Sequence, residues 1–180
     1  MPKTKKTLLA DFLLPTVLII GSKYVSVFIF NLVLFLDWRF AFSAYQVFTI
    51  PFIQYKNQTD LIMVSSFSTL IMTMVLAVGY SLALYRFQYF HENFIEPKQA
   101  ARLYSKKKEY LIFQEVRAHN QITVWFTLAW VTFLATLLGY LGGTIVLFVV
   151  LVNLVIVLLL SSSTIFDMHK KSLILKEKSK

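Results

Sequence analysis

Histidine and glutamate side chains flank the polar segment in the middle of the chain, and these residue types can bind metal ions. His91, Glu92 and Glu96 follow one long apolar stretch, and Glu115 and His119 precede the next. Glu115 and His119 are four residues apart and would share one face of a helix, and helix bundles build di-metal sites from such pairs. All five residues adjoin Lys and Arg and would be easily solvated. We therefore expect ordinary surface charge, with no metal, cofactor or catalytic residue, and keep a membrane enzyme with a surface metal site as an alternative.

Three polar side chains fall inside stretches that are otherwise apolar. Lys23 lies about seven residues into the first of them, where an ammonium group is costly and a functional role is the default hypothesis. Its four-carbon stem could extend to the headgroups, it could pair with a carboxylate or lipid phosphate of a neighbouring molecule, or it could line a path for an ion or substrate. Asn31 in the first stretch and Asn153 in the middle of the last should hydrogen-bond between helices, with a polar path as the alternative.

Small and hydroxyl-bearing residues recur at helical spacing in two of the apolar stretches. Small residues let two helix backbones approach closely, and hydroxyl groups can bond across the gap. We expect the second and third spans to pack on each other or on a partner through these faces, and a hydroxyl-lined water path is the alternative. The second span contributes Ser65, Thr69, Thr73, Ala77 and Ser81, and the third contributes Thr132, Ala135, Thr136 and Gly139.

The elements that carry these residues must cross a membrane. From Ala118 to Phe166 the chain runs 49 residues without Asp, Glu, Lys or Arg. As one helix, Ile122 to Ile165 would be roughly 66 Å long, about twice the hydrocarbon core of a bilayer. The run must therefore fold back once, and the glycines between Gly139 and Gly143 predict the turn.

The same reasoning along the chain predicts an all-α integral membrane protein with four transmembrane helices and additional interfacial or amphipathic helices. Pro15 separates a basic interfacial segment from the first span. The expected spans are 16–36, 61–85, 122–141 and 144–162, and between and around them lie the basic segment 1–15, an aromatic outer loop 37–60, a basic helical loop 86–121 and a basic tail 163–180. The apolar part of the outer loop, 40–53, is too short to cross and either lies along the interface or re-enters the bilayer.

The distribution of positive charge predicts the orientation. Of the 18 basic residues, 15 fall in the N-terminal segment, the loop 86–121 and the C-terminal tail, while Arg39 and Lys56 alone fall in the outer loop. Because basic residues are retained on the cytoplasmic side, both termini are expected in the cytoplasm. The net charge of +9 is then better explained by contact with an anionic cytoplasmic leaflet than by nucleic acid.

Three functions are compatible with this sequence. The lack of cysteine excludes disulfide scaffolds, thiol redox chemistry and iron–sulfur clusters. The first function is a non-enzymatic accessory or structural subunit of a larger membrane complex. The second is a small homo-oligomeric channel or transporter, with Lys23, Asn31, Asn153 and the hydroxyl groups of the second span along its path. The third is the metal-dependent membrane enzyme introduced above.

Overall fold

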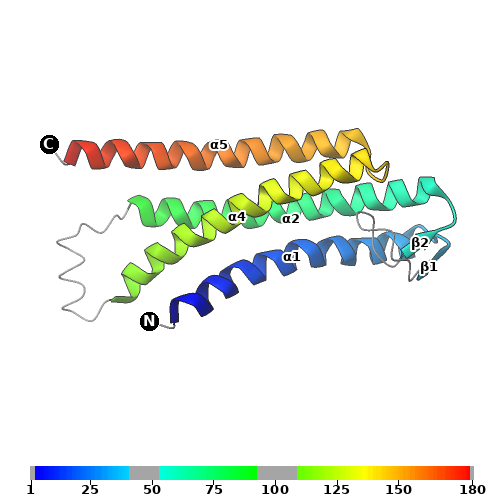
Figure 1. Ribbon diagram of the computed structural model, residues 1–180, viewed down its shortest axis with the longest axis horizontal. Helices are drawn as coiled ribbons and strands as arrows, with labels where there is room; N and C mark the ends of the chain where they lie inside the picture. The colour runs from blue at the N-terminus through cyan, green and yellow to red at the C-terminus, as the bar shows by residue number, and fades with distance from the viewer. Residues whose placement is uncertain (1–2, 41–52, 93–108, 179–180) are drawn as a thin grey trace.

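Four long helices make up most of the computed structural model, which describes residues 3–40, 53–92 and 109–178. They are α1 (Lys3–Val33), α2 (Gln58–Glu92), α4 (Glu109–Leu141) and α5 (Leu147–Lys178). The helices run along one long axis, and the two ends of the chain lie at the same end of the molecule (Figure 1). The central helix is α2, which contacts each of the other three.

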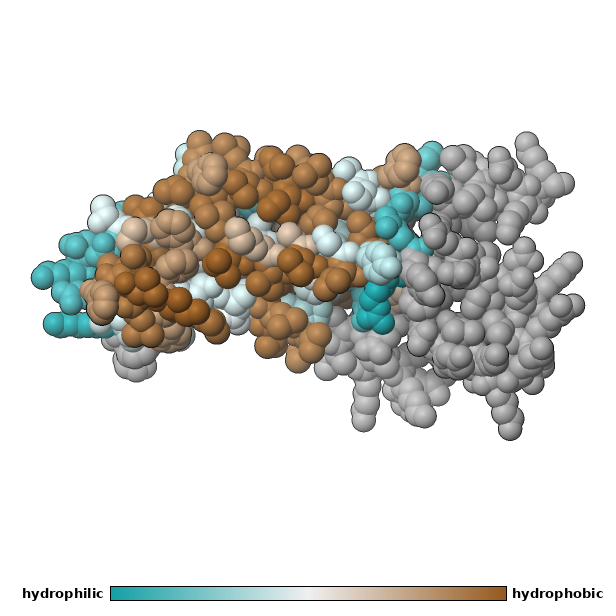
Figure 2. All heavy atoms as spheres, turned by 180° about the vertical axis from the view of Figure 1, so that it is seen from behind, coloured by the Kyte–Doolittle hydropathy of each residue, from teal (hydrophilic) through white to brown (hydrophobic). Residues whose placement is uncertain are grey.

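The surface of the bundle is as apolar as its interior. One stretch in each helix is long and apolar enough to cross a membrane: Phe12–Val33, Gln58–Gln88, Asn120–Leu141 and Leu147–Asp167. Large apolar side chains such as Leu32 and Leu159 are more than 60% exposed on this surface. Figure 2 shows them as a hydrophobic band bordered at both ends by hydrophilic residues. In water such a band would drive aggregation, whereas in a bilayer it is the expected boundary with lipid.

The first helix continues through Pro15, unlike the interfacial segment and separate span expected from the sequence. Proline removes one helical hydrogen bond and usually breaks a helix in water. Within a bilayer, neighbouring helices and hydroxyl side chains re-satisfy the backbone, and proline is tolerated. Here Pro15 is buried, and its missing amide removes the helical hydrogen bond to the carbonyl of Asp11. The adjacent Thr16 Oγ1 adds a hydrogen bond to the next carbonyl, that of Phe12, over 2.8 Å. Figure 1 shows α1 curving along its N-terminal part without ending there.

The segment 37–60, which the sequence analysis expected to be an outer loop, contains two short strands that the all-α expectation did not include. Strands β1 (Trp38–Phe40) and β2 (Ile53–Tyr55) pair antiparallel, with Trp38 opposite Tyr55 and Phe40 opposite Ile53. In both strands a polar residue stands between aromatic or β-branched ones, which is the alternation that favours a strand. Residues 41–52 lie outside the described part of the chain, and with them most of the 40–53 segment.

The helices also extend beyond the expected spans at the end that carries the termini. The second helix continues from the 61–85 span to Glu92, and α5 continues into the expected tail as far as Lys178. The expected helical loop 86–121 is divided: its first residues belong to α2, its last belong to α4, and residues 93–108 lie outside the description.

The turn between α4 and α5 forms where the glycines predict it. The backbone amides of Gly142, Gly143 and Thr144 donate to carbonyl groups of the last turn of α4, each over 2.9 Å. Gly143 has a φ of +70°, which favours a residue without a side chain. Gly139 remains inside α4, where an added Cβ would lie 2.5 Å from Cδ1 of Ile145. Its role is thus close packing of the turn against the end of the helix.

Candidate functional site

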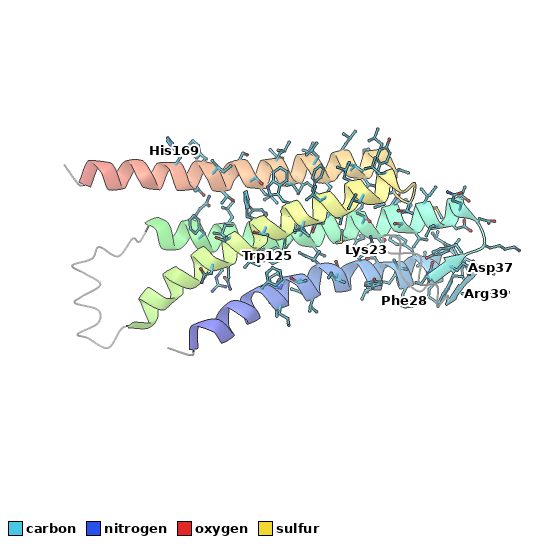
Figure 3. The ribbon with its side chains drawn as sticks, in the orientation of Figure 1. Lys23, Phe28, Asp37, Arg39, Trp125 and His169 are labelled. Atoms are coloured by element: carbon cyan, nitrogen blue, oxygen red, sulfur yellow. The ribbon has the colours of Figure 1, made fainter. Side chains whose placement is uncertain are left out.

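Lys23 lies on the inward face of α1, near the middle of the span. Pro15, Ile19, Val27 and Asn31 are buried at four-residue intervals along this face, and Lys23, half-buried, occupies the central position of the series. It is the twelfth residue of the 22-residue stretch that begins at Phe12. About 16 Å of helix therefore separates it from that end of the span, well beyond the reach of a four-carbon stem. Figure 3 shows Lys23 on α1 between the levels of Trp125 and the strand pair.

Two apolar clusters lie on either side of Lys23. Ile19 belongs to a cluster that includes Met72 of α2, and Val27 belongs to a second cluster that includes Val64. Since α1 and α2 are antiparallel neighbours, Lys23 lies along their interface between these two clusters.

Buried hydroxyl groups lie in α2 between Val64 and Met72. Ser68 is fully buried and donates to the carbonyl of Ser65 over 3.1 Å. Thr69 Oγ1 is also buried and makes no hydrogen bond to the described part of the chain.

No acidic residue accompanies Lys23 within the bilayer. Among the four membrane-crossing stretches, only Asp60 and Asp167 carry carboxylate groups, and they lie near the two opposite ends of the molecule. Within the described residues, Lys23 has no ion pair. A buried or half-buried charge in a bilayer is normally paired, so the charge of Lys23 is not balanced by the spans of its own chain.

Asn31 connects α1 to the strand pair. Its side chain is 2% exposed, and the phenol of Tyr55 donates to its Oδ1 over 2.8 Å. Burial raises the pKa of Tyr55 above its ordinary value, and the carboxylate of Asp60 adds to this increase. The tyrosine therefore remains a hydrogen-bond donor at neutral pH.

Asn153 connects α5 to α4. It is fully buried, and its Nδ2 donates to Thr136 Oγ1 over 2.9 Å, while Thr136 donates to the carbonyl of Thr132 over 2.8 Å. It is the seventh residue of the 21-residue stretch Leu147–Asp167, so it lies about one helical turn from the middle of the span, on the side of the α4–α5 turn. The arrangement is the interhelical hydrogen bond that the sequence suggests for a lone amide in an apolar helix.

The small-residue faces are only partly directed inward. In α2, Ser65, Thr69 and Thr73 are buried, whereas Ala77 is half-buried and Ser81 is exposed. In α4, Thr132, Thr136 and Gly139 are buried, whereas Ala135 is exposed. The first three members of the α2 series and three of the four members of the α4 series are thus buried inside the bundle, and Thr136 bonds to Asn153 of α5.

A groove opens between α1, α2 and α4 in the half of the bundle that carries the termini. Its volume is about 710 Å³. Leu14 and Leu18 of α1 form one wall, and Val78 and Leu82 of α2 form the other. Arg86 also lines the groove, as the last of its α2 residues towards the end that carries the termini. Because its lining comes from three helices, no motif within one segment could have revealed it.

The indole ring of Trp125 forms part of the lining because α2 has no side chain at Gly79. A Cβ built at Gly79 would lie 2.1 Å from Cη2 of Trp125, so the ring lies directly on the α2 backbone. Trp125 is 8% exposed and also belongs to the apolar cluster of Ile19. Next to it, Gln121 of α4 contributes an amide group to the groove.

The candidate metal ligands have side chains that lie outside the described part of the structure. Glu96 lies outside the described residues, as do the side chains of His91, Glu92, Glu115 and His119. Where side chains are described, no three His, Asp or Glu residues come together in a way that could hold a metal ion.

Comparisons with known proteins give no relative from which a function could be transferred. No protein-family model matches the chain, and neither the curated proteins nor the solved structures contain a match to it. The structure itself identifies a mostly helical protein with four helices that are long and apolar enough to cross a membrane.

Proposed function

We propose that this protein is a non-enzymatic accessory subunit that assembles with another membrane protein within the bilayer. The observation that carries the proposal is the half-buried Lys23 at mid-span, without a carboxylate from its own spans. An ammonium group in hydrocarbon costs several kcal/mol unless it is hydrated or paired. A partner helix with an Asp or Glu at the same depth would balance this charge.

The packing of α1 supports a contact at this helix. Its membrane-crossing stretch is 22% buried inside the chain, compared with 44% for α2. Most of its surface is therefore open to lipid or to another protein. Gly21, where an added Cβ would meet no atom within 4 Å, is two residues and about 200° around the helix from Lys23, so it belongs to a separate, outward face of α1 that a neighbouring helix could approach closely.

The packing gives less support to a channel. Asn31 and Asn153, which would line a path between copies, are at most 2% exposed and are hydrogen-bonded within the chain. Leu76, Tyr80 and Ile122 are each fully buried in the apolar cluster at the centre of the bundle. A polar path through a single chain would have to cross this cluster.

The proposal is tested by purifying the chain in mild detergent from the membranes that naturally contain it. We expect a complex larger than the monomer, measured by size-exclusion chromatography with light scattering. Lys23→Met should remove at least about nine tenths of the bound partner, because an unpaired carboxylate left in the bilayer costs 2.5 kcal/mol or more on the scale of about 1.4 kcal/mol per tenfold. Lys23→Arg keeps the charge and should retain the partner.

A charge exchange provides the matched control. Once crosslinking has located the partner's acidic residue, its substitution by Lys should disrupt the complex with wild-type chain and restore it with Lys23→Glu. Lys56→Met removes an exposed charge next to the strand pair, at one end of the molecule, and should leave the complex intact. A monomeric wild-type protein, or full assembly of Lys23→Met, would contradict the proposal.

A further inference from the structure

We propose that the groove between α1, α2 and α4 binds one anionic phospholipid of the surrounding bilayer. One acyl chain would lie between Leu14 and Leu18 on α1 and Val78 and Leu82 on α2, with the phosphate group at Arg86. This site is separate from Lys23 and does not depend on the proposed assembly with a partner subunit.

The walls of the groove fit a hydrocarbon chain. Leu14, Val78 and Leu82 are each more than 60% exposed and line the groove with branched apolar side chains. Ligand sites in proteins commonly have volumes of about 300–1,000 Å³, and the volume of about 710 Å³ falls within this range.

The polar residues at one end of the groove determine which lipid headgroup it would bind. Arg86 is exposed near the end of the α2 stretch Gln58–Gln88, at the depth where headgroups begin. A guanidinium group binds phosphate through two parallel hydrogen bonds, and the amide of Gln121 offers a further donor beside it. Among the described residues that line the groove none is Asp or Glu, so the charge of Arg86 favours an anionic headgroup over a zwitterionic one.

The arrangement of the helices keeps the groove open. In Figure 1, α1 diverges from α2 towards its N-terminus, on the side where the groove lies. The contact of Trp125 with the backbone at Gly79 brings α4 close to α2 and places the indole within reach of a bound chain. Trp125 is therefore a built-in reporter of occupancy.

Fluorescence quenching in vesicles tests the proposal. The full chain with Trp38→Phe and Trp130→Phe retains Trp125 as its single tryptophan, since the sequence has three. The protein is reconstituted in vesicles of phosphatidylcholine. In one sample a small fraction of the lipid is phosphatidylglycerol with brominated acyl chains, and in the other the same fraction is phosphatidylcholine with brominated acyl chains. We expect brominated phosphatidylglycerol to occupy the site with about fivefold preference, as one Arg at a membrane surface provides.

Two pairs of variants separate headgroup binding from chain binding. Arg86→Gln should remove the preference, while Lys56→Gln at the other end of the molecule should keep it. Val78→Phe should fill the groove and reduce quenching by both lipids, while Val155→Phe, at a similarly exposed valine of α5, should not. Equal quenching of the wild-type tryptophan by both lipids, or a preference that survives Arg86→Gln, would overturn the proposal.

Native mass spectrometry of the chain with all its tryptophans gives an independent measurement. The wild type should retain one phosphatidylglycerol more often than one phosphatidylcholine, and Arg86→Gln should retain both equally. Retention of neither lipid by the wild type would also overturn the proposal. Because this measurement does not involve Lys23 or a partner, it can fail while the accessory-subunit proposal stands.

Discussion

Hydrogen bonds between side chains join the helices of this bundle, and one of them links Asn153 of α5 to Thr136 of α4. The Nδ2 atom of Asn153 donates to Thr136, while its Oδ1 atom is buried without a partner among the described residues. We expect Asn153→Ala and Thr136→Val each to lower the free energy of unfolding by about 1–2 kcal/mol.

A double-mutant cycle isolates the hydrogen bond from the cost of the cavity. The coupling energy between Asn153→Ala and Thr136→Val should be about 0.5–2 kcal/mol, measured by unfolding in mixed micelles. Purely additive effects would show that the bond contributes nothing to stability. Ser163→Ala, which removes an exposed hydroxyl of α5, is the matched control.

Two glycines within membrane helices should respond in opposite ways to the same substitution. Gly79→Ala would place a methyl group 2.1 Å from Trp125, so the indole must move and stability should fall by about 1–3 kcal/mol. Gly21→Ala meets no atom within 4 Å and should leave stability unchanged or slightly higher. Thermal unfolding and the emission maximum of the tryptophans measure both effects, and equal effects of the two substitutions would contradict this explanation.

The sequence identifies the polar residues that become buried but not where each small-residue face ends. A residue four positions further along a helix is rotated by about 40°, so the series from Ser65 to Ser81 turns by about 160°. This is why Ser65 is buried and Ser81 faces outward. The groove was not predictable because Arg86 and Gln121 acquire a common role only when α2 and α4 meet.

Among the elements, the strand pair and α1 depend on each other through Tyr55 and Asn31. Because burial and the Asp60 carboxylate raise the pKa of Tyr55, the folded state holds the phenolic proton more tightly than the unfolded state. The stability from this residue is therefore fully present below its unfolded pKa of about 10 and is lost as the pH rises through the higher folded pKa.

A pH series compares the wild type with Tyr55→Phe. The difference in unfolding free energy between the two should be constant from about pH 7 to pH 9 and should shrink above about pH 10. A difference that stays constant to the highest accessible pH would contradict a raised pKa of Tyr55 in the folded state. Tyr140→Phe, which alters an exposed tyrosine at the α4–α5 end, is the control.

The elements also show which parts of a membrane fold are encoded locally. The α4–α5 turn is predictable because Gly143 adopts a conformation that other residues avoid. The continuation of α1 through Pro15 is not, because it depends on the surrounding bilayer and neighbouring helices. The β1–β2 pairing could not be predicted from the sequence because each strand has only three residues and residues 41–52 separate the two strands.

For the whole molecule, the positive charges predict an orientation that labelling can test. The sequence contains no cysteine, so any cysteine introduced is unique. In intact cells we expect an impermeant maleimide to label Lys56→Cys but not Thr4→Cys or Ser179→Cys, with all three labelled after permeabilisation. Labelling of the two terminal positions in intact cells would reverse the orientation, and labelling of only one would contradict the even number of crossings.

The central position of α2 has a consequence for biosynthesis. Its partners are made late: Tyr80 bonds to a residue 84 positions further along the chain, and Ser66 accepts from an amide 80 positions further along. At roughly 5–20 residues per second, α2 waits about 4–17 s for these partners after it leaves the ribosome. During that interval its serine and threonine groups face lipid or an insertion factor. The seconds after α2 leaves the ribosome are therefore when this chain is most open to recognition by membrane quality control.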